Sequence, residues 1–306
     1  MYKYHNLNPI SQVGLDEFTK DYAPVSTPET ADAILVRSAA MHEMEFAPDL
    51  KAIARAGAGV NNIPLEKCAE QGIVVFNTPG ANANGVKELV IAGMLLASRD
   101  IIGGINWVQE NEEDGNIAKD AEKAKKAFAG QELEGKKLGV IGLGAIGFAF
   151  AKMAQGFGMH VLAYSRHKKE GAAYDFIEQV SLDELLARSD FISLHTPHTP
   201  ATERMIDQDT IARMKDGVVL INTARGALID EQALADALAS GKVLAAGLDV
   251  LTDEPPVCGS PLLTAPNTVI TGHIAWLTRE SRIRAIDMAI DNFRCYLEGH
   301  PVSIIN

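Results

Sequence analysis

The sequence contains little cysteine and no long apolar run. Its three cysteines, Cys68, Cys258 and Cys295, are widely spaced and odd in number, so they predict neither a disulfide framework nor a zinc cluster. We interpret them as buried small hydrophobic residues and expect a reducing cytoplasm. Apolar stretches such as residues 89–97 are much shorter than the ~20 residues that cross a bilayer. Residues 1–12 lack the apolar run of a signal peptide.

Negative charge exceeds positive charge. The 306 residues include 28 Lys and Arg against 40 Asp and Glu, which leaves a net charge of −12. That charge would repel a phosphate backbone or an anionic lipid surface, so we expect no nucleic-acid partner and no membrane partner. With 47% hydrophobic and 22% charged residues, the composition is that of a globular chain with one or two cores. It excludes disorder, collagen and coiled coil.

Short β-rich runs alternate with helical segments along the chain. Residues 33–37, 52–55 and 73–76 predict buried strands, and residues 64–71 predict a short helix closed by Gly72. Such alternation favours a parallel sheet with helices on both faces.

Two helical segments follow, residues 84–99 and residues 101–127, and we interpret the second as an arm or a spacer. A second β/α series then begins. Its predicted strands are residues 137–142, 160–164, 191–194, 218–222, 243–248 and 269–271, and its helices include residues 145–156 and 230–240. The last helix, residues 279–298, would return to pack on the N-terminal unit. We therefore expect two α/β units, the second inserted into the first.

A glycine-rich turn, GLGAIG at residues 142–147, fits the pattern G-x-G-x-x-G. It directly follows an apolar run and opens a helix, which is the context that dinucleotide binding requires. The first glycine would make the tight turn, the second would let the backbone approach a pyrophosphate, and the third would let helix and strand pack closely. We expect the cofactor at Gly142, Gly144, Ala145, Ile146 and Gly147. A plain strand-turn-helix is the alternative.

The group that binds the adenosine ribose is expected at the end of the next strand, about 20 residues further on. Residues 165–169, SRHKK, follow that strand and contain no carboxylate. A carboxylate would bond the ribose hydroxyls and repel a 2′-phosphate, whereas Ser165 and Arg166 offer a donor and a positive charge. The turn therefore favours NADP(H), or at least tolerates it. The alternative is a solvated basic turn, with NAD bound through other contacts.

Three further motifs fall in loops after predicted strands, where open parallel sheets bind ligands. They are NTARG (222–226), DVLTDEPP (249–256) and GHIA (272–275). Together with GLGAIG, HTPHTPAT (195–202), GAGVNNI (57–63) and NTPGANANGVKELV (77–90), they cover nearly the whole chain. In these motifs the chain resembles the D-isomer-specific 2-hydroxyacid dehydrogenase family, and within it the phosphoglycerate dehydrogenases.

The resemblance implies a Rossmann-type doubly wound parallel sheet inserted into a second, smaller flavodoxin-like α/β domain. Residues 99–277 would form the dinucleotide-binding domain, and residues 1–98 with 278–306 the substrate-binding domain. The cofactor would be NAD or NADP, and the substrate a small 2-hydroxy or 2-oxo acid. The expected reaction converts 3-phosphoglycerate to 3-phosphohydroxypyruvate, the first step of serine biosynthesis. A homodimer would form through the nucleotide domain, with residues 101–127 as a contact arm.

The resemblance also implies a catalytic triad of Arg225, Glu254 and His273. Oxidation of a 2-hydroxy acid needs a base for the hydroxyl proton, and an imidazole, with an ordinary pKa of about 6.5, works in both directions. Glu254 would favour the imidazolium and fix its tautomer. The Arg225 fork would bind the substrate carboxylate and polarise the C2 oxygen. Taken singly, each residue has a structural alternative: an ion pair, a turn cap or a satisfied buried histidine.

Further binding residues follow from the resemblance one by one. Backbone amides of Ala58, Gly59 and Val60 would hold the substrate carboxylate, next to Arg225 and His273. The cofactor would contact His195, Thr196, Pro197, Thr223, Ala224, Asp249 and Ala275, with Asp249 bonding the nicotinamide amide. Arg55 would bind a substrate phosphate and Lys87 could add charge, the alternatives being a sheet-edge ion pair and a solvated lysine.

Three departures from the family pattern leave the substrate open. No carboxylate follows the ribose strand, Asn61 stands where the family often has Asp, and the chain ends at Asn306, without the regulatory domain of many phosphoglycerate dehydrogenases. An NADPH-linked glyoxylate or hydroxypyruvate reductase is therefore the alternative function. A non-catalytic, nucleotide-gated binding protein is the alternative of another class. Because no His, Cys or carboxylate cluster has ligand spacing, we expect no metal.

Overall fold

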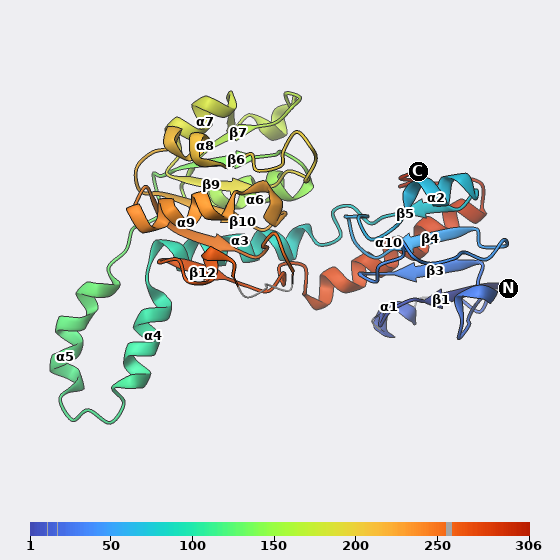
Figure 1. The fold of residues 1–306 in the computed structure, drawn as a ribbon, viewed down its shortest axis with the longest axis horizontal. Helices are drawn as coiled ribbons and strands as arrows, with labels where there is room; N and C mark the ends of the chain where they lie inside the picture. Colours follow the sequence, from blue (N-terminus) through green and yellow to red (C-terminus); the bar gives the residue numbers. More distant parts are fainter. Residues whose placement is uncertain (11, 17, 255–258) are drawn as a thin grey trace. The chain divides into compact units, whose positions relative to one another are not determined.

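The chain forms two compact units (Figure 1): one comprises residues 1–85 and 276–306, and the other comprises residues 86–275. The computed structural model describes the whole chain except residues 11, 17 and 255–258. Each unit has the predicted α/β architecture, built on a sheet with parallel ladders. None of the described helices is long and apolar enough to cross a membrane.

The first unit contains a five-stranded sheet in the order β2-β1-β3-β4-β5. Its strands are β1 (Tyr2–Asn6), β2 (Tyr22–Pro24), β3 (Ala33–Val36), β4 (Ala52–Arg55) and β5 (Val74–Phe76). Its helices are α1 (Gln12–Leu15), η1 (Pro28–Thr30), α2 (Leu65–Glu70) and α10 (Arg279–Leu297). This strand order is the flavodoxin-like one, which confirms that part of the predicted fold.

The second unit contains a seven-stranded sheet in the order β12-β11-β10-β9-β6-β7-β8. Its strands are β6 (Lys137–Ile141), β7 (His160–Tyr164), β8 (Ile177–Gln179), β9 (Phe191–Leu194), β10 (Val218–Asn222), β11 (Val243–Leu248) and β12 (Thr268–Ile270). This is the Rossmann order with one additional strand. Because the order reverses between β6 and β9, the carboxyl ends of these strands form the crevice where such sheets bind ligands.

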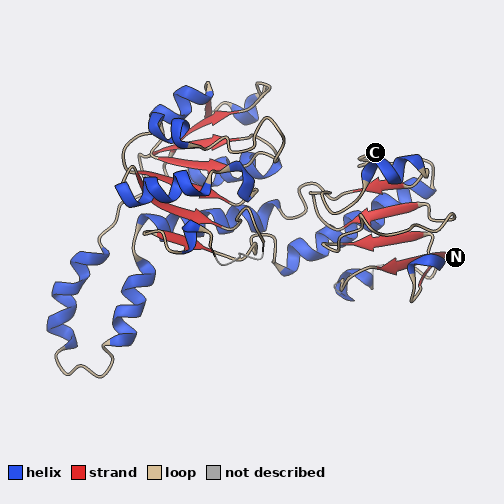
Figure 2. Cartoon of the chain, in the orientation of Figure 1, coloured by secondary structure: helices blue, strands red, loops and turns tan. Residues whose placement is uncertain are grey.

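Helices cover both faces of the seven-stranded sheet (Figure 2). On one face, α7 (Leu182–Arg188), α8 (Gln208–Arg213) and α9 (Glu231–Ser240) share a hydrophobic cluster with the strands. On the other, α3 (Ala83–Ser98) and α6 (Ala145–Gly156) do the same. Short 3-10 turns complete the unit: η2 (Lys125–Phe128), η3 (Ala172–Tyr174), η4 (Gly226–Leu228) and η5 (Pro261–Leu263).

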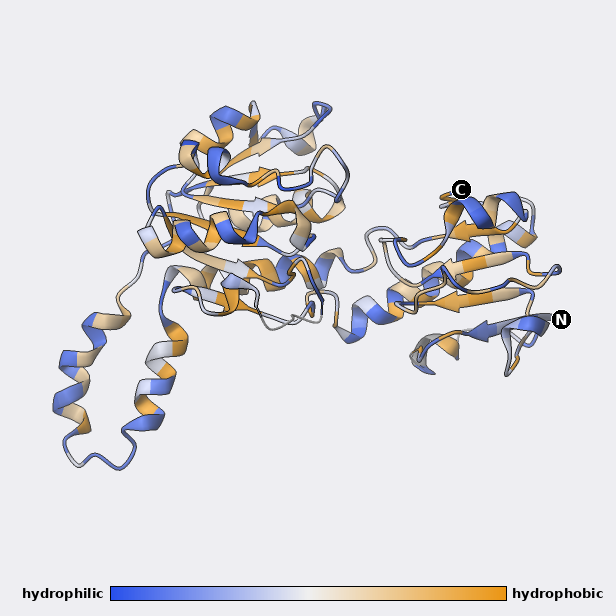
Figure 3. Ribbon diagram, viewed as in Figure 1, coloured by the Kyte–Doolittle hydropathy of each residue, from blue (hydrophilic) through white to orange (hydrophobic). Residues whose placement is uncertain are grey.

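The central strands are apolar on both sides because helices bury both faces of the sheet. Figure 3 shows this concentration of hydrophobic residues along the strands. All five residues of β10 are buried, for example. The last residue of β10, Asn222, is polar and therefore requires hydrogen-bond partners inside the protein.

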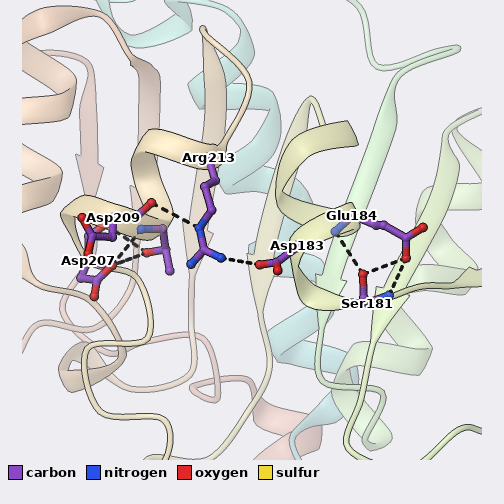
Figure 4. A network of polar contacts seen from close by, with 7 residues as sticks. Ser181, Asp183, Glu184, Asp207, Asp209 and Arg213 are labelled. Atoms are coloured by element: carbon purple, nitrogen blue, oxygen red, sulfur yellow. Dashed lines mark hydrogen bonds and ion pairs between the residues drawn. The ribbon is translucent and has the colours of Figure 1, made fainter.

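Side-chain caps fix where the helices on one face begin. Ser181 and Glu184 form a capping box at the start of α7, and Asp207 caps α8 in the same way through Thr210. Arg213, in the last turn of α8, pairs with Asp183 in the first turn of α7 and joins the two helices (Figure 4). These caps hold the helices that flank β9 and β10.

The predicted helical segment 101–127 is wrong as one continuous helix. It consists of α4 (Ile101–Glu110), α5 (Ile117–Ala124) and the 3-10 turn η2. Residues 111–116, NEEDGN, form the break, because Asn, Asp and Gly favour turns. The two helices extend away from the seven-stranded sheet as an arm (Figure 1), and the described residues of α4 and α5 include none that is buried.

The unit boundaries differ from the predicted ones. The prediction places residues 1–98 in the first unit, whereas the structure divides the chain after Gly85. The physical reason is α3, since Val86, Val90 and Met94 pack in the core of the second unit. At the other end the division falls after Ala275 rather than after residue 277.

Candidate active site

The glycine turn between β6 and α6 is shaped by contacts within the protein. Gly142 has a φ of 102°, and a Cβ there would lie 2.6 Å from the carbonyl oxygen of His195. A Cβ on Gly147 would lie 2.0 Å from the carbonyl oxygen of Gly142. At Gly144, the N-cap of α6, no described atom lies within 4 Å of the Cβ position. The turn therefore leaves open space beside the first amides of α6, where a pyrophosphate would bind.

Ala145 and Ile146, predicted cofactor contacts, form the first turn of α6, Ala145 exposed and Ile146 half-buried.

His195 follows β9, opposite this turn. Its Nε2 lies 2.9 Å from Ser193 Oγ, and its ring lies 5.3 Å from the ring of Phe150. Burial lowers the pKa of His195 to about 3, so the imidazole is neutral around pH 7. The next residues, Thr196 and Pro197, are half-buried and exposed. His195 can thus line a cofactor site but is not the proton donor of a reaction at neutral pH.

The turn after β7 carries the predicted ribose residues. Arg166 is exposed and makes no ion pair with the described part of the chain. Ser165 differs from the expectation, because its hydroxyl donates to the carbonyl of His167 at 2.7 Å. Its proton is engaged within the turn, so of the two predicted ribose residues only Arg166 presents an unengaged donor among the described residues.

The turn after β10 presents Arg225. Asn222 is fully buried, and its side chain bonds to the backbone of Ala224 and Arg225. Arg225 is extended (φ −147°, ψ 137°), and its Nη1 donates to the carbonyl of Ala224 at 2.6 Å. The Thr223 hydroxyl is buried with no partner among the described residues, as expected of a group that meets a ligand.

Gly226 joins this turn to the loop that carries Glu254. A Cβ on Gly226 would lie 1.9 Å from the carbonyl carbon of Leu251 and 2.3 Å from the amide nitrogen of Thr252. Only a residue without a side chain lets these two backbone segments approach so closely. The positions of Arg225 and of the loop at 251–254 are therefore coupled by backbone contact.

His273 and Glu254 are brought together as the sequence predicts. His273 Nδ1 lies 2.5 Å from Glu254 Oε2. An ionised carboxylate only accepts, so Nδ1 carries the hydrogen and Nε2 is left to exchange a proton with a substrate. Leu251 N donates to Glu254 Oε1 at 3.3 Å and orients the carboxylate. Pro255 and Pro256 of this motif lie outside the described residues.

Asp249 holds the loop of His273. This residue is 2% exposed. Oδ1 accepts from Thr271 Oγ1 at 2.5 Å and from Ile274 N at 2.8 Å. Oδ2 accepts from Ala275 N at 2.9 Å. His273 N donates to the Asp249 carbonyl at 2.7 Å, although His273 has a φ of 55°. Two carboxylate oxygens have about four lone pairs, so these three bonds leave one acceptor position of Asp249 unused. Ala275, predicted to contact the cofactor, is buried at 4% exposure.

The predicted substrate residues of the first unit lie at the carboxyl edge of its sheet. Arg55 ends β4, and its guanidinium occupies the space beside Gly57, where a Cβ would lie 1.8 Å from Nη1. The loop of Ala58, Gly59 and Val60 follows directly. The carbonyl of Ala58 accepts from Asn77 Nδ2 at 2.7 Å, which fixes the loop from behind.

Sequence reasoning missed residues that matter for these arrangements. Arg37 directly follows β3, and the register pairs Val36 with Arg55 on β4. The Arg37 guanidinium lies 5.2 Å from the ring centroid of Trp276. A cation one residue past a buried strand is a signal that the sequence offers. For Asn77 and Asn222 the sequence signal is weaker, because the hydrogen bonds of a buried amide side chain can be identified only once the fold is known.

A nicotinamide dinucleotide fits the residues present in the second unit. The strand order reverses between β6 and β9. On one side of this point, β6 leads to the open space at Gly144 and to the start of α6, which has no side-chain cap. On the other side, β10 leads to the Thr223 hydroxyl, which has no partner among the described residues. Arg225, Glu254 and His273 follow the neighbouring strands β10, β11 and β12. Among the described residues no group of three or more His, Cys, Asp or Glu could hold a metal ion.

Comparison with known proteins agrees with this geometry. Residues 91–275 match the NAD binding domain of the D-isomer specific 2-hydroxyacid dehydrogenases. A hydroxypyruvate reductase from Thermotoga maritima is 44% identical over 278 residues, which cover 89% of this chain and 87% of the relative. A solved glyoxylate reductase from Paecilomyes thermophila is 30% identical, with a TM-score of 0.84, and the match covers 99% and 98% of the two chains.

A second group of relatives is longer. A D-3-phosphoglycerate dehydrogenase from Mycobacterium leprae is 41% identical over 276 residues, which cover 89% of this chain. The match covers 50% of that relative, so the chain spans about half its length.

Proposed function

The chain belongs to the D-isomer specific 2-hydroxyacid dehydrogenases, and we propose that within this family it interconverts 3-phosphoglycerate and 3-phosphohydroxypyruvate. The observation that carries this choice is the Arg55 guanidinium, which lies at the carboxyl end of β4 beside Gly57, next to the loop predicted to bind the substrate carboxylate. Arginine forks match the geometry of a phosphate. This reaction would be the first step of serine biosynthesis.

The reacting groups have separate roles. A nicotinamide cofactor, when bound in the second unit, would supply the hydride for C2 or accept it. Arg225 binds the substrate carboxylate and stabilises the charge that develops on the C2 oxygen. During reduction His273 gives the proton on Nε2 to that oxygen, and during oxidation it takes the proton back. Glu254 holds Nδ1 and thereby keeps Nε2 directed at the substrate.

The first unit carries the further predicted substrate residues. Amides of Ala58, Gly59 and Val60 would bind the carboxylate, and Asn77 Nδ2 fixes this loop through the Ala58 carbonyl. Arg55 would bind the phosphate in the space that Gly57 provides.

A hydroxypyruvate reductase is the second candidate. The relative from Thermotoga maritima matches this chain over most of its own length and is a hydroxypyruvate reductase. The carboxylate-free turn after β7 also suits NADPH, the cofactor of a reductive enzyme. We propose NADP(H) as the preferred cofactor on the strength of exposed Arg166.

We further propose that the arm of α4 and α5 binds a second copy of the chain. Four large apolar residues of α4 are 40–55% exposed: Ile101, Ile102, Ile105 and Val108. Short helices without buried residues have little stability alone, and an exposed apolar stripe marks an interaction site. The resemblance implies that the partner is the same chain.

His273→Gln should lower kcat about 10²- to 10⁴-fold with every 2-oxo acid, because proton transfer is lost while the fold is retained. Arg225→Lys should both raise KM and lower kcat, because a point charge replaces the fork that binds the carboxylate and stabilises the C2 oxygen. The measurement is cofactor absorbance with 3-phosphohydroxypyruvate, hydroxypyruvate and glyoxylate. His160→Gln, an exposed histidine at the start of β7, is the control. Near-normal rates in His273→Gln would refute the assignment, and a wild type silent with all substrates would favour a binding protein.

Arg55→Gln should lower kcat/KM for 3-phosphohydroxypyruvate about 10- to 100-fold, because hydrogen bonds to a charged group are lost. Turnover of hydroxypyruvate should change little, since it has no phosphate. Lys51→Gln, at the residue directly before β4, is the control. Equal losses with both substrates, or a wild type that prefers hydroxypyruvate, would favour the second candidate.

Arg166→Ser should weaken NADPH binding about tenfold and leave NADH binding nearly unchanged, because only NADPH carries the 2′-phosphate. Cofactor titration by fluorescence measures both affinities, and Lys152→Ser, an exposed cation on α6, is the control. A wild type that strongly prefers NADH contradicts the proposal.

Ile105→Glu combined with Val108→Glu should convert the dimer to a monomer, because both charges would be buried in the contact. Sedimentation velocity distinguishes the two states. Leu244→Glu, at another exposed apolar site of the same unit, should leave the dimer intact. A wild-type monomer would rule out this role of the arm.

A further inference from the structure

One buried amide lies directly behind Arg225. Asn222 ends β10 and is 0% exposed, so no substrate or cofactor can touch it. A buried amide must be hydrogen-bonded or it destabilises the fold. Its partners therefore define what it does.

Both ends of this side chain bond to the Arg225 turn. Oδ1 accepts from Ala224 N at 3.0 Å, and Nδ2 donates to Arg225 O at 2.9 Å. The bonded groups lie on either side of the peptide that joins Ala224 to Arg225, so the side chain fixes the backbone there. Asparagine is suited because it offers an acceptor and a donor at this short reach, whereas ionised aspartate only accepts.

The backbone of Asn222 continues the connection. Its carbonyl accepts from Asp249 N at 2.9 Å, and the Asp249 carbonyl accepts from His273 N at 2.7 Å. Hydrogen bonds thus run without interruption from Arg225 through Asn222 and Asp249 to His273. Arg225 and His273 are set relative to each other by groups that never meet the substrate.

We propose that Asn222 is a positioning residue for the reaction, acting through Arg225. The inference rests on the proposed function, in which Arg225 binds the substrate carboxylate. It assigns to Asn222 the alignment of the guanidinium with the imidazole of His273.

The test compares Asn222→Ala, which removes both side-chain bonds, with Asn222→Asp, which keeps the acceptor and places an oxygen against the Arg225 carbonyl. Misalignment should lower kcat/KM for the preferred 2-oxo acid about 10²-fold. Oxamate, an unreactive carboxylate, is titrated by fluorescence into the enzyme that already holds reduced cofactor. The affinity for oxamate should fall about tenfold. Asn267→Asp is the matched control, because its Nδ2 also donates to a backbone carbonyl, that of Leu244.

A double-mutant cycle separates positioning from a general structural role. If Asn222 acts through Arg225, Asn222→Ala should add little to the oxamate loss of Arg225→Lys. If the losses of oxamate affinity in the two single variants multiply in the double variant, the proposal is overturned. Asn222 variants with wild-type kcat/KM and wild-type oxamate affinity would also overturn it. If neither variant folds with a cooperative melting curve and binds cofactor, the role of Asn222 is structural and the proposal falls. A wild type that neither reduces 2-oxo acids nor binds oxamate would instead refute the proposed function itself.

Discussion

The structure of the active site depends on one constraint: a chain that leaves a buried parallel strand must still hydrogen-bond its backbone. Asn222, the last residue of β10, is 0% exposed. Asp249, the residue directly after β11, is 2% exposed. Water does not reach these sites, and each unmade bond would cost about 1–3 kcal/mol. The two polar side chains supply the partners, and in doing so they determine the paths of the loops that carry Arg225 and His273.

Close backbone packing and local strain complete this arrangement. Gly226 brings the Arg225 turn against residues 251–252, on the way to Glu254. His273 adopts a left-handed conformation that costs about 1–2 kcal/mol for a residue with a Cβ. The bonds from Asp249 to the amides on both sides of this residue offset that cost. The backbone of His273 is thus held by the buried Asp249, and its imidazole by Glu254.

Local sequence signals identified most of the framework. The apolar run of β10 and the cap of α9 at Gly241, which has a φ of 78°, depend on neighbouring residues alone, so they are readable from the sequence. β1 was missed because its polar residues give no apolar run. The assignment of α3 to the second unit depends on distant packing, and so do the bonds of Asn222 and Asp249, which no spacing reveals. Proximity of Glu254 to His273 followed from the resemblance.

The division of the chain has an evolutionary consequence. All three residues assigned to hydride and proton chemistry occur between residues 222 and 275, within the second unit, whereas Arg37 and Arg55 belong to the first. Under the proposed assignment, mutations that accumulate in the first unit would change which acid is accepted while leaving the chemical machinery unaltered. Such a layout would let a single ancestral reaction diverge toward different acids.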